Sequence, residues 1–347
     1  MNFALPKSAR AAGLSALVVG LLLVLPTTLT SQTIKMATLS PEGSPWDTIL
    51  ERMGSQWEQG TQGRVSLRIY PGGVAGDEPD IIRKIKIGQY QAAAVSVAGL
   101  ADIHKDFTVF EIPLFYRDFD EMAAVLESLT PTLRQSLDEK GFHLLGWGYV
   151  GWVYFFITEP VATVQDMQAL KILTLAGDET LVQWWRRNGF QPVALAATDI
   201  LTGLKTGMVD AVTLPPLYAM QTQYYKSAPY MADLPLAPMM GAILISKRSW
   251  SRLSAADQQV MEEAAQVAKT QLFDQIPKLD ETAINLMKGQ GMTVLEINGS
   301  EHADAWLDAA ERFANDMRGT IVPVPIFDAA EAARAKHRAE HAEQGSQ

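Results

Sequence analysis

Short apolar segments alternate with amphipathic segments along most of this chain, and this alternation limits the possible fold more than any other feature of the sequence. Residues 33–39 and 64–70 have the composition and spacing of strands, and residues 46–59 between them have the apolar spacing of a helix. Residues 170–214 repeat the alternation. Because strands that alternate with helices form mainly parallel sheets, the sequence predicts an α/β fold with two lobes.

The last third of the chain reads as mainly helical. Ser254 with Asp257 is a capping-box variant that begins a long helix towards Lys288, and Pro277 is expected to kink it. Residues 329–347 are rich in Ala, Glu, Arg and His, so this tail is predicted to be frayed or disordered. The predicted organisation is a signal peptide at residues 1–30, a first lobe at residues 33–152 plus about 245–277, a second lobe at residues 153–244 plus about 278–325, and the tail.

The amino terminus has the layout of a secretory signal. Lys7 and Arg10 precede an apolar stretch at residues 11–25, and small polar residues follow up to a plausible cleavage site after Thr30. A membrane anchor is the alternative, but the apolar stretch is shorter than the roughly 20 residues that a spanning helix needs. Because the chain has no cysteine, it has neither disulfides nor a lipid-bearing thiol. We expect a cleaved signal peptide and a mature protein outside the cytoplasm.

The composition argues against several partners. Lys and Arg number 29 and Asp and Glu number 39, so the formal net charge is −10. An acidic chain attracts neither nucleic acid nor anionic lipid at long range. We therefore expect no nucleic-acid partner.

The sequence contains no convincing motif for catalysis or for cofactor binding. Gly146, Gly148 and Gly151 spell G-x-G-x-x-G, but they lie between aromatic strands predicted around residues 144–148 and 153–158, not before a helix. These glycines more plausibly permit close approach of the backbone where the chain crosses between lobes. His337 and His341 are four residues apart and could lie on one helix face, but no third metal ligand accompanies them. The sequence also has no recognisable catalytic motif. The sequence predicts no enzyme, no cofactor and no metal site.

Tryptophan positions point to a ligand cleft. Trp46, Trp152, Trp184 and Trp185 fall in predicted loops and at strand ends, and ligands of open α/β lobes bind outside the carboxyl ends of strands. Packing in the core is the alternative for any one of them. For the four together, at corresponding positions of two lobes, a cleft is the better explanation.

Several segments, in order, resemble the solute-binding proteins of tripartite ATP-independent periplasmic (TRAP) transporters. They are GRVSLRIYPGG at residues 63–73, FEIPLF at 110–115, VQDMQALKI at 164–172, LKTGMVDA at 204–211 and ISKRSW at 245–250. The resemblance covers about residues 33–322. It implies a two-lobed clamp with a long helix across both lobes, which captures a solute in the periplasm and delivers it to a membrane permease. It also implies, for some relatives, a helical-repeat partner protein.

This chain departs from the resemblance where the solute is held. Members of the family usually have an arginine after the strand that ends here with Lys171-Ile172, and it pairs with the solute carboxylate, whereas this chain has Leu173. Leucine cannot form charge-assisted hydrogen bonds. We therefore expect a hydrophobic or weakly polar solute. The predicted ligand-binding residues are Trp46, Ser96, Val97, Trp152, Leu173, Thr174, Trp184, Leu214, Pro215 and Tyr218.

Two alternatives remain open at this stage. Arg117, Arg186 or Arg187 could replace the missing arginine and bind a small organic acid. The same clamp could also serve as an exported sensor or enzyme without a permease.

Overall fold

One sheet forms the centre of the fold. The structure, a computed structural model, describes residues 31–177 and 179–344. The strand order in these residues is β2-β1-β3-β9-β4-β7-β5-β6, with β8 paired to β4 and β10 paired to β8. The strands are β1 (Gln32–Thr38), β2 (Val65–Tyr70), β3 (Ala92–Ser96), β4 (Phe142–Ile157), β5 (Lys171–Leu175), β6 (Gln191–Leu195), β7 (Ala211–Leu214), β8 (Tyr230–Ala232), β9 (Ala237–Ser246) and β10 (Thr293–Leu295).

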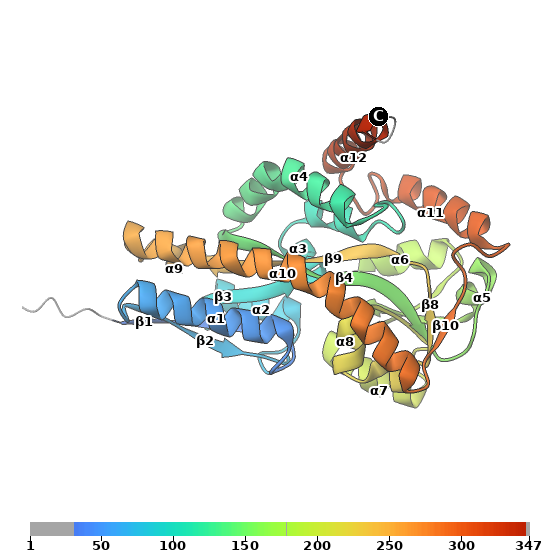
Figure 1. Cartoon of the computed structure of the whole chain (residues 1–347), viewed down its shortest axis with the longest axis horizontal. Coiled ribbons are helices and arrows are strands. Elements are labelled where there is room, and N and C mark those ends of the chain that lie inside the picture. The colour runs from blue at the N-terminus through green and yellow to red at the C-terminus, as the bar shows by residue number, and fades with distance from the viewer. Residues whose placement is uncertain (1–30, 178, 345–347) are drawn as a thin grey trace, which may run out of the picture. The chain divides into compact units, whose positions relative to one another are not determined.

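Helices surround this sheet (Figure 1). The α-helices are α1 (Pro45–Gly60), α2 (Glu78–Lys86), α3 (Val97–Ile103), α4 (Phe119–Glu139), α5 (Val164–Ala169), α6 (Glu179–Arg187), α7 (Ile200–Thr206), α8 (Pro216–Gln221), α9 (Lys247–Trp250), α10 (Ala255–Gly289), α11 (Ala303–Met317) and α12 (Val324–Gln344). Short 3-10 helices are η1 (Lys105–Glu111), η2 (Ala197–Asp199) and η3 (Tyr224–Lys226).

The sheet has two parallel halves joined by antiparallel strands. β1, β2 and β3 are parallel in one half, and β5, β6 and β7 are parallel in the other. β4 runs through both halves, because it pairs with β9 as far as Val153 and with β7 from Tyr154. The predicted two-lobed α/β fold is confirmed, although β4 is one strand of 16 residues where two were expected. The boundaries of the two lobes remain a prediction. The predicted boundary after Trp152 lies next to the point where β4 changes its pairing from β9 to β7.

Local sequence signals explain where several helices begin. Ser44 caps α1 by accepting a hydrogen bond from the N–H of Asp47, and Pro45 occupies the first turn, where no N–H is needed. Ser254 accepts a hydrogen bond from the N–H of Asp257 at 3.1 Å, so the predicted start of the long helix is confirmed.

The long helix α10 connects the two halves of the fold. It packs against α1, β4 and α8, and it continues through Pro277 to Gly289. Figure 1 shows that it changes direction along its length, as a helix with an internal proline is expected to do. Elements of both sheet halves therefore share one long support.

The carboxy-terminal segment is a docked helix rather than a frayed or disordered tail. Residues 329–344 belong to α12, which packs against α4. Arg338 forms two hydrogen bonds with the buried carboxylate of Glu121, at 2.7 and 2.8 Å. The Arg334 guanidinium stacks over the Phe115 ring at 3.7 Å. The prediction of a frayed solvent helix or disorder missed this docking, because contacts distant in sequence hold the helix and no apolar periodicity announces them.

We expect Arg338→Gln to lower the free energy of unfolding by about 1–2 kcal/mol in urea denaturation. The change leaves the Glu121 carboxylate, which is 1% exposed, without its guanidinium partner; the exposure of Arg338 to solvent moderates the loss. The matched control is Lys336→Gln on the same helix, where the ion pair with Glu340 is 3.9 Å long and exposed. Equal stability of Arg338→Gln and the control would show that this ion pair does not hold α12.

Candidate functional site

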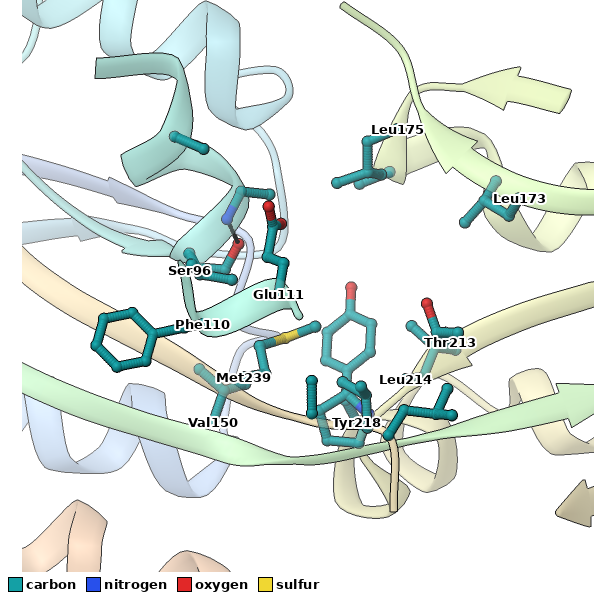
Figure 2. Close-up of a pocket in the computed structure, with 18 of the residues that line it drawn as sticks. Ser96, Phe110, Glu111, Val150, Leu173, Leu175, Thr213, Leu214, Tyr218 and Met239 are labelled. Carbon is teal, nitrogen blue, oxygen red and sulfur yellow. Dashed lines mark hydrogen bonds between the residues drawn. The ribbon is translucent and has the colours of Figure 1, made fainter. Parts of the chain in front are cut away.

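A cavity of about 350 Å³ is lined by residues from both halves of the sheet. In Figure 2, Ser96 and Glu111 lie on one wall, and Leu173 and Leu175 of β5 lie on the opposite wall. Val150, Met239, Thr213, Leu214 and Tyr218 form the region between them in this view. The aromatic residues of the lining are Trp46, Phe110, Phe155, Trp184, Trp185, Phe190, Tyr218, Trp306 and Phe313. Burial of apolar surface is therefore the main binding force that this cavity offers.

Most of the predicted ligand-binding residues border this cavity. They are Trp46, Ser96, Val97, Leu173, Thr174, Trp184, Leu214, Pro215 and Tyr218. Several come from the carboxyl ends of β3, β5 and β7 or from the turns that follow, where α/β folds bind ligands. Their contact with a solute stays a prediction.

Trp152 does not border the cavity. Successive side chains of a strand point to opposite faces, and Val153 and Phe155 of β4 line the cavity. Trp152 therefore faces away from it. The sequence could not reveal this, because the register of β4 shifts between Tyr149 and Gly151.

Glycines in β4 make room for one wall of the cavity. A Cβ on Gly148 would lie only 2.2 Å from the Trp46 ring, so only glycine allows that ring to lie against β4. Trp46 Nε1 donates a hydrogen bond to the carbonyl of Tyr149 at 3.0 Å, which fixes the ring. The prediction that these glycines serve close backbone approach is confirmed.

The charged types of residue in the described cavity lining are all acidic. The lining includes the carboxyl residues Asp77, Glu78, Asp102 and Glu111. Among the described residues that line it, there is no lysine, arginine or histidine. Arg117, Arg186 and Arg187 are exposed and lie outside the lining, so none of them supplies the missing cation in this structure.

The side chain of Glu78, the first residue of α2, lies against the amino terminus of α3. Its carboxylate accepts hydrogen bonds from the Ser96 N–H at 2.6 Å, from the Ser96 hydroxyl at 2.7 Å and from the Gly99 N–H at 2.8 Å. Burial raises the pKa of Glu78, and these hydrogen bonds oppose the rise. The donors that could attract a solute anion at this position already serve an internal carboxyl group.

Asp77 connects the two halves of the fold across the cavity. One carboxylate oxygen accepts from the N–H of Glu78 at 2.9 Å, and the other accepts from the N–H of Ala197 in η2 at 3.0 Å. The start of α2 and the region of β6 are thus held together at the edge of the lining.

Asp280 of α10 supports the cavity from behind. It is 8% exposed and accepts hydrogen bonds from the N–H groups of Leu217, at 3.0 Å, and Trp152. A Cβ on Gly151 would lie 2.6 Å from both Asp280 Oδ2 and Pro215 Cβ, so glycine is required where β4, α8 and α10 meet. Burial raises the pKa of Asp280 to about 7, against the effect of its two hydrogen bonds.

Sequence reasoning missed the contribution of α11. Trp306, Ala310, Phe313 and Met317 of this helix line the cavity. Their spacing of three or four residues places them on one helix face, which was the available signal. Nothing local indicated that this face covers a cavity formed by residues from positions 38 to 239.

Two negative findings concern the described residues alone. They include no cluster of three or more His, Cys, Asp or Glu side chains suited to a metal ion. No helix in residues 31–177 and 179–344 has the length and apolar character needed to cross a membrane. The predicted signal peptide at residues 1–30 lies outside the described residues.

Comparison with known families gives a match over most of the chain. The family model described as "Bacterial extracellular solute-binding protein, family 7" (DctP) matches residues 36–318. A solute-binding protein of Chromohalobacter salexigens is 27% identical over 233 residues, which cover 66% of this chain and 69% of that protein. The C4-dicarboxylate-binding periplasmic protein DctP of Rhodobacter capsulatus is 25% identical over 268 residues, covering 76% and 80%.

A solved structure has the same fold. It is a TRAP periplasmic solute binding protein from Xanthobacter autotrophicus with bound β-D-galacturonate. The TM-score is 0.79 at 19% identity, and the match covers 87% of this chain and 99% of that one.

Proposed function

Since this chain belongs to family 7 of the bacterial extracellular solute-binding proteins, the DctP family, we propose that it captures a hydrophobic or weakly polar solute. The chain is a TRAP-type solute-binding receptor, and such receptors bind small molecules and work with a membrane permease. In this proposal the two walls of the cavity close on the solute, and the closed receptor delivers it to the permease. We infer that the mature chain acts in the periplasm, as the related DctP of Rhodobacter capsulatus does.

The absence of a cation from the described lining carries this proposal. The related Xanthobacter protein binds galacturonate, an anion, and proteins recognise carboxylates best with arginine. Here Leu173 borders the cavity at the position where the family resemblance implies an arginine. Nine aromatic residues of the described part of the chain also line the cavity. Apolar contact yields about 25 cal/mol per Å² of buried surface, less the cost of immobilising the solute.

The position of Glu78 supports the same solute class. A solute carboxylate near α3 would meet the Glu78 carboxyl group, which already uses the N–H groups of Ser96 and Gly99. A solute carboxylate at this position would therefore find neither of these backbone donors free. An uncharged, mainly apolar solute does not need one.

Hinge closure fits the contacts across the cavity. Asp77 and Ala197 belong to opposite halves of the fold and share a hydrogen bond of 3.0 Å at the edge of the cavity. A solute that touches both walls adds contacts that only the closed state makes, so it stabilises that state. We propose that this closed form is what the permease recognises.

The test is to identify what the exported protein carries. We expect native mass spectrometry of the protein purified from the periplasm to detect a bound apolar or weakly polar molecule. We also expect tryptophan fluorescence to respond to neutral apolar compounds and not to galacturonate or C4 dicarboxylates. Tight binding of these acids without any response to apolar compounds would refute the proposed solute class and leave the receptor role intact.

A helical-repeat partner stays a prediction of the resemblance. An apolar solute is poorly soluble in water, so a partner that shields it between receptor and permease would be useful. Affinity capture of the solute-loaded receptor with its native permease tests for such a protein.

A further inference from the structure

Two residues that line the cavity each carry a polar side-chain atom without a hydrogen-bond partner among the described residues. Oγ1 of Thr174 and Nε1 of Trp184 are buried and unpaired within the described part of the chain. Thr174 is 4% exposed and Trp184 is 1% exposed, and both residues line the cavity. A buried polar group without a partner costs about 1–3 kcal/mol, so each such group in a native protein requires an explanation.

Two other tryptophans of the same lining, Trp46 and Trp306, do have partners. Trp46 Nε1 donates to the carbonyl of Tyr149, and Trp306 Nε1 donates to the carbonyl of Ala162, each at 3.0 Å. An unpaired indole N–H is therefore not a general property of this wall. It distinguishes Trp184 from Trp46 and Trp306.

The surroundings of Trp184 are aromatic. Its ring makes edge-to-face contacts with Trp185 and Phe313, with centroid distances of 5.3 and 5.4 Å. Thr174 lies in β5 directly after Leu173, in register with Ala194 of β6. These apolar neighbours offer no acceptor through their side chains, whereas a solute in the cavity brings its own polar atoms.

On the basis of the proposed function, we propose that the solute is an uncharged, mainly apolar molecule with hydroxyl or carbonyl oxygens. These oxygens accept hydrogen bonds from Nε1 of Trp184 and Oγ1 of Thr174. An indole N–H only donates, so a solute whose polar atoms are all donors would leave Trp184 unpaired. A carboxylate accepts, but it would bring a negative charge to a described lining that holds four carboxyl residues and no basic side chain.

The experiment measures how decane, decanol and decanoate displace the neutral fluorescent probe N-phenyl-naphthylamine from the mature protein. We expect decanol to bind about tenfold more tightly than decane, because two hydrogen bonds contribute roughly 1 kcal/mol each, less the cost of desolvating its hydroxyl. Decanoate should bind less tightly than decanol. Thr174→Val and Trp184→Phe each remove one donor and keep most of the side-chain volume, so each should reduce the preference for decanol about threefold to fivefold.

Trp57→Phe is the matched control. Trp57 Nε1 is also buried without a partner among the described residues, but Trp57 lies in α1 outside the lining. This variant should keep the full preference for decanol. Circular dichroism melting checks that all variants fold; Thr174→Val, which changes shape least, preserves the test if Trp184→Phe does not fold.

The outcomes separate this inference from the proposed function. Equal binding of decane and decanol, or an unchanged preference in Thr174→Val and Trp184→Phe, would overturn the assignment of these two donors while apolar binding stands. Binding of galacturonate with no displacement by decane or decanol would overturn the proposed solute class itself.

Discussion

From about pH 5 to about pH 8, the free energy of unfolding is expected to fall by about 2.5 kcal/mol more in this protein than in its Asp280→Asn variant. Burial raises the pKa of Asp280 to about 7, so the folded protein holds this proton more tightly than the unfolded chain. The resulting stabilisation is complete below the ordinary aspartate pKa and is lost as the pH rises through 7. Urea denaturation at a series of pH values measures the difference between the two slopes.

Neighbouring groups do not obscure this comparison. Tyr149 and Tyr154 lie near Asp280, and burial raises the pKa of both, so they stay protonated over the range. The raised pKa of Glu78 has the same sign of effect, but it acts equally in both proteins and cancels. Asp274→Asn, at an exposed position of the same helix, is the matched control and should keep the wild-type slope. Equal slopes in the wild type and Asp280→Asn would mean that the Asp280 carboxylate is not destabilised by burial.

Asp280 connects stability to the binding site through its partners. It accepts from Trp152 of β4 and Leu217 of α8, and two residues of the cavity lining, Leu214 at the end of β7 and Pro215, directly precede α8. The carboxyl group of Asp280 therefore contacts elements that carry residues of the cavity lining.

The sequence predicted the fold well wherever local signals control it. The alternation of residues 64–70, the cap at Ser254 and the start of the first helix all correspond to elements of the structure. It failed where distant contacts decide. Two separate strands were expected where β4 is continuous, because β4 gains its length from pairing with β9, which lies far along the chain. The contacts that dock α12 include an ion pair between positions 121 and 338, which are far apart in the sequence.

Residue type and position relative to strand ends predicted much of the cavity lining. Trp184 and Leu173 border the cavity because β5 and the helix after it present them there. Trp152 does not, because a shift in the register of β4 decides which face its side chain occupies. The unpaired state of Thr174 and Trp184 is a property of three-dimensional neighbours. No single-residue pattern in the sequence encodes it.

Replacing Leu173 with arginine is expected to weaken binding of a neutral apolar probe at least thirtyfold, a loss of about 2 kcal/mol. Leu173 is 9% exposed and extends from β5 towards the cavity in Figure 2. A guanidinium at this position must either lose its hydration in an aromatic cavity or keep water there, and both oppose entry of an apolar solute. Titration of N-phenyl-naphthylamine fluorescence measures the loss.

Two further variants show that the charge in the cavity is the cause. Leu173→Met keeps an apolar side chain of similar volume and should bind the probe within about threefold of wild type. Leu286→Arg makes the same chemical change at a position of α10 that is 50% exposed, so it should leave binding unchanged. If Leu173→Arg bound the probe as tightly as the wild type while remaining folded, Leu173 would not contact the solute. The presence of leucine at position 173, where the family resemblance implies an arginine, would then carry no information about the charge of the solute. The absence of basic residues from the described lining would be the remaining explanation for a preference for an uncharged solute.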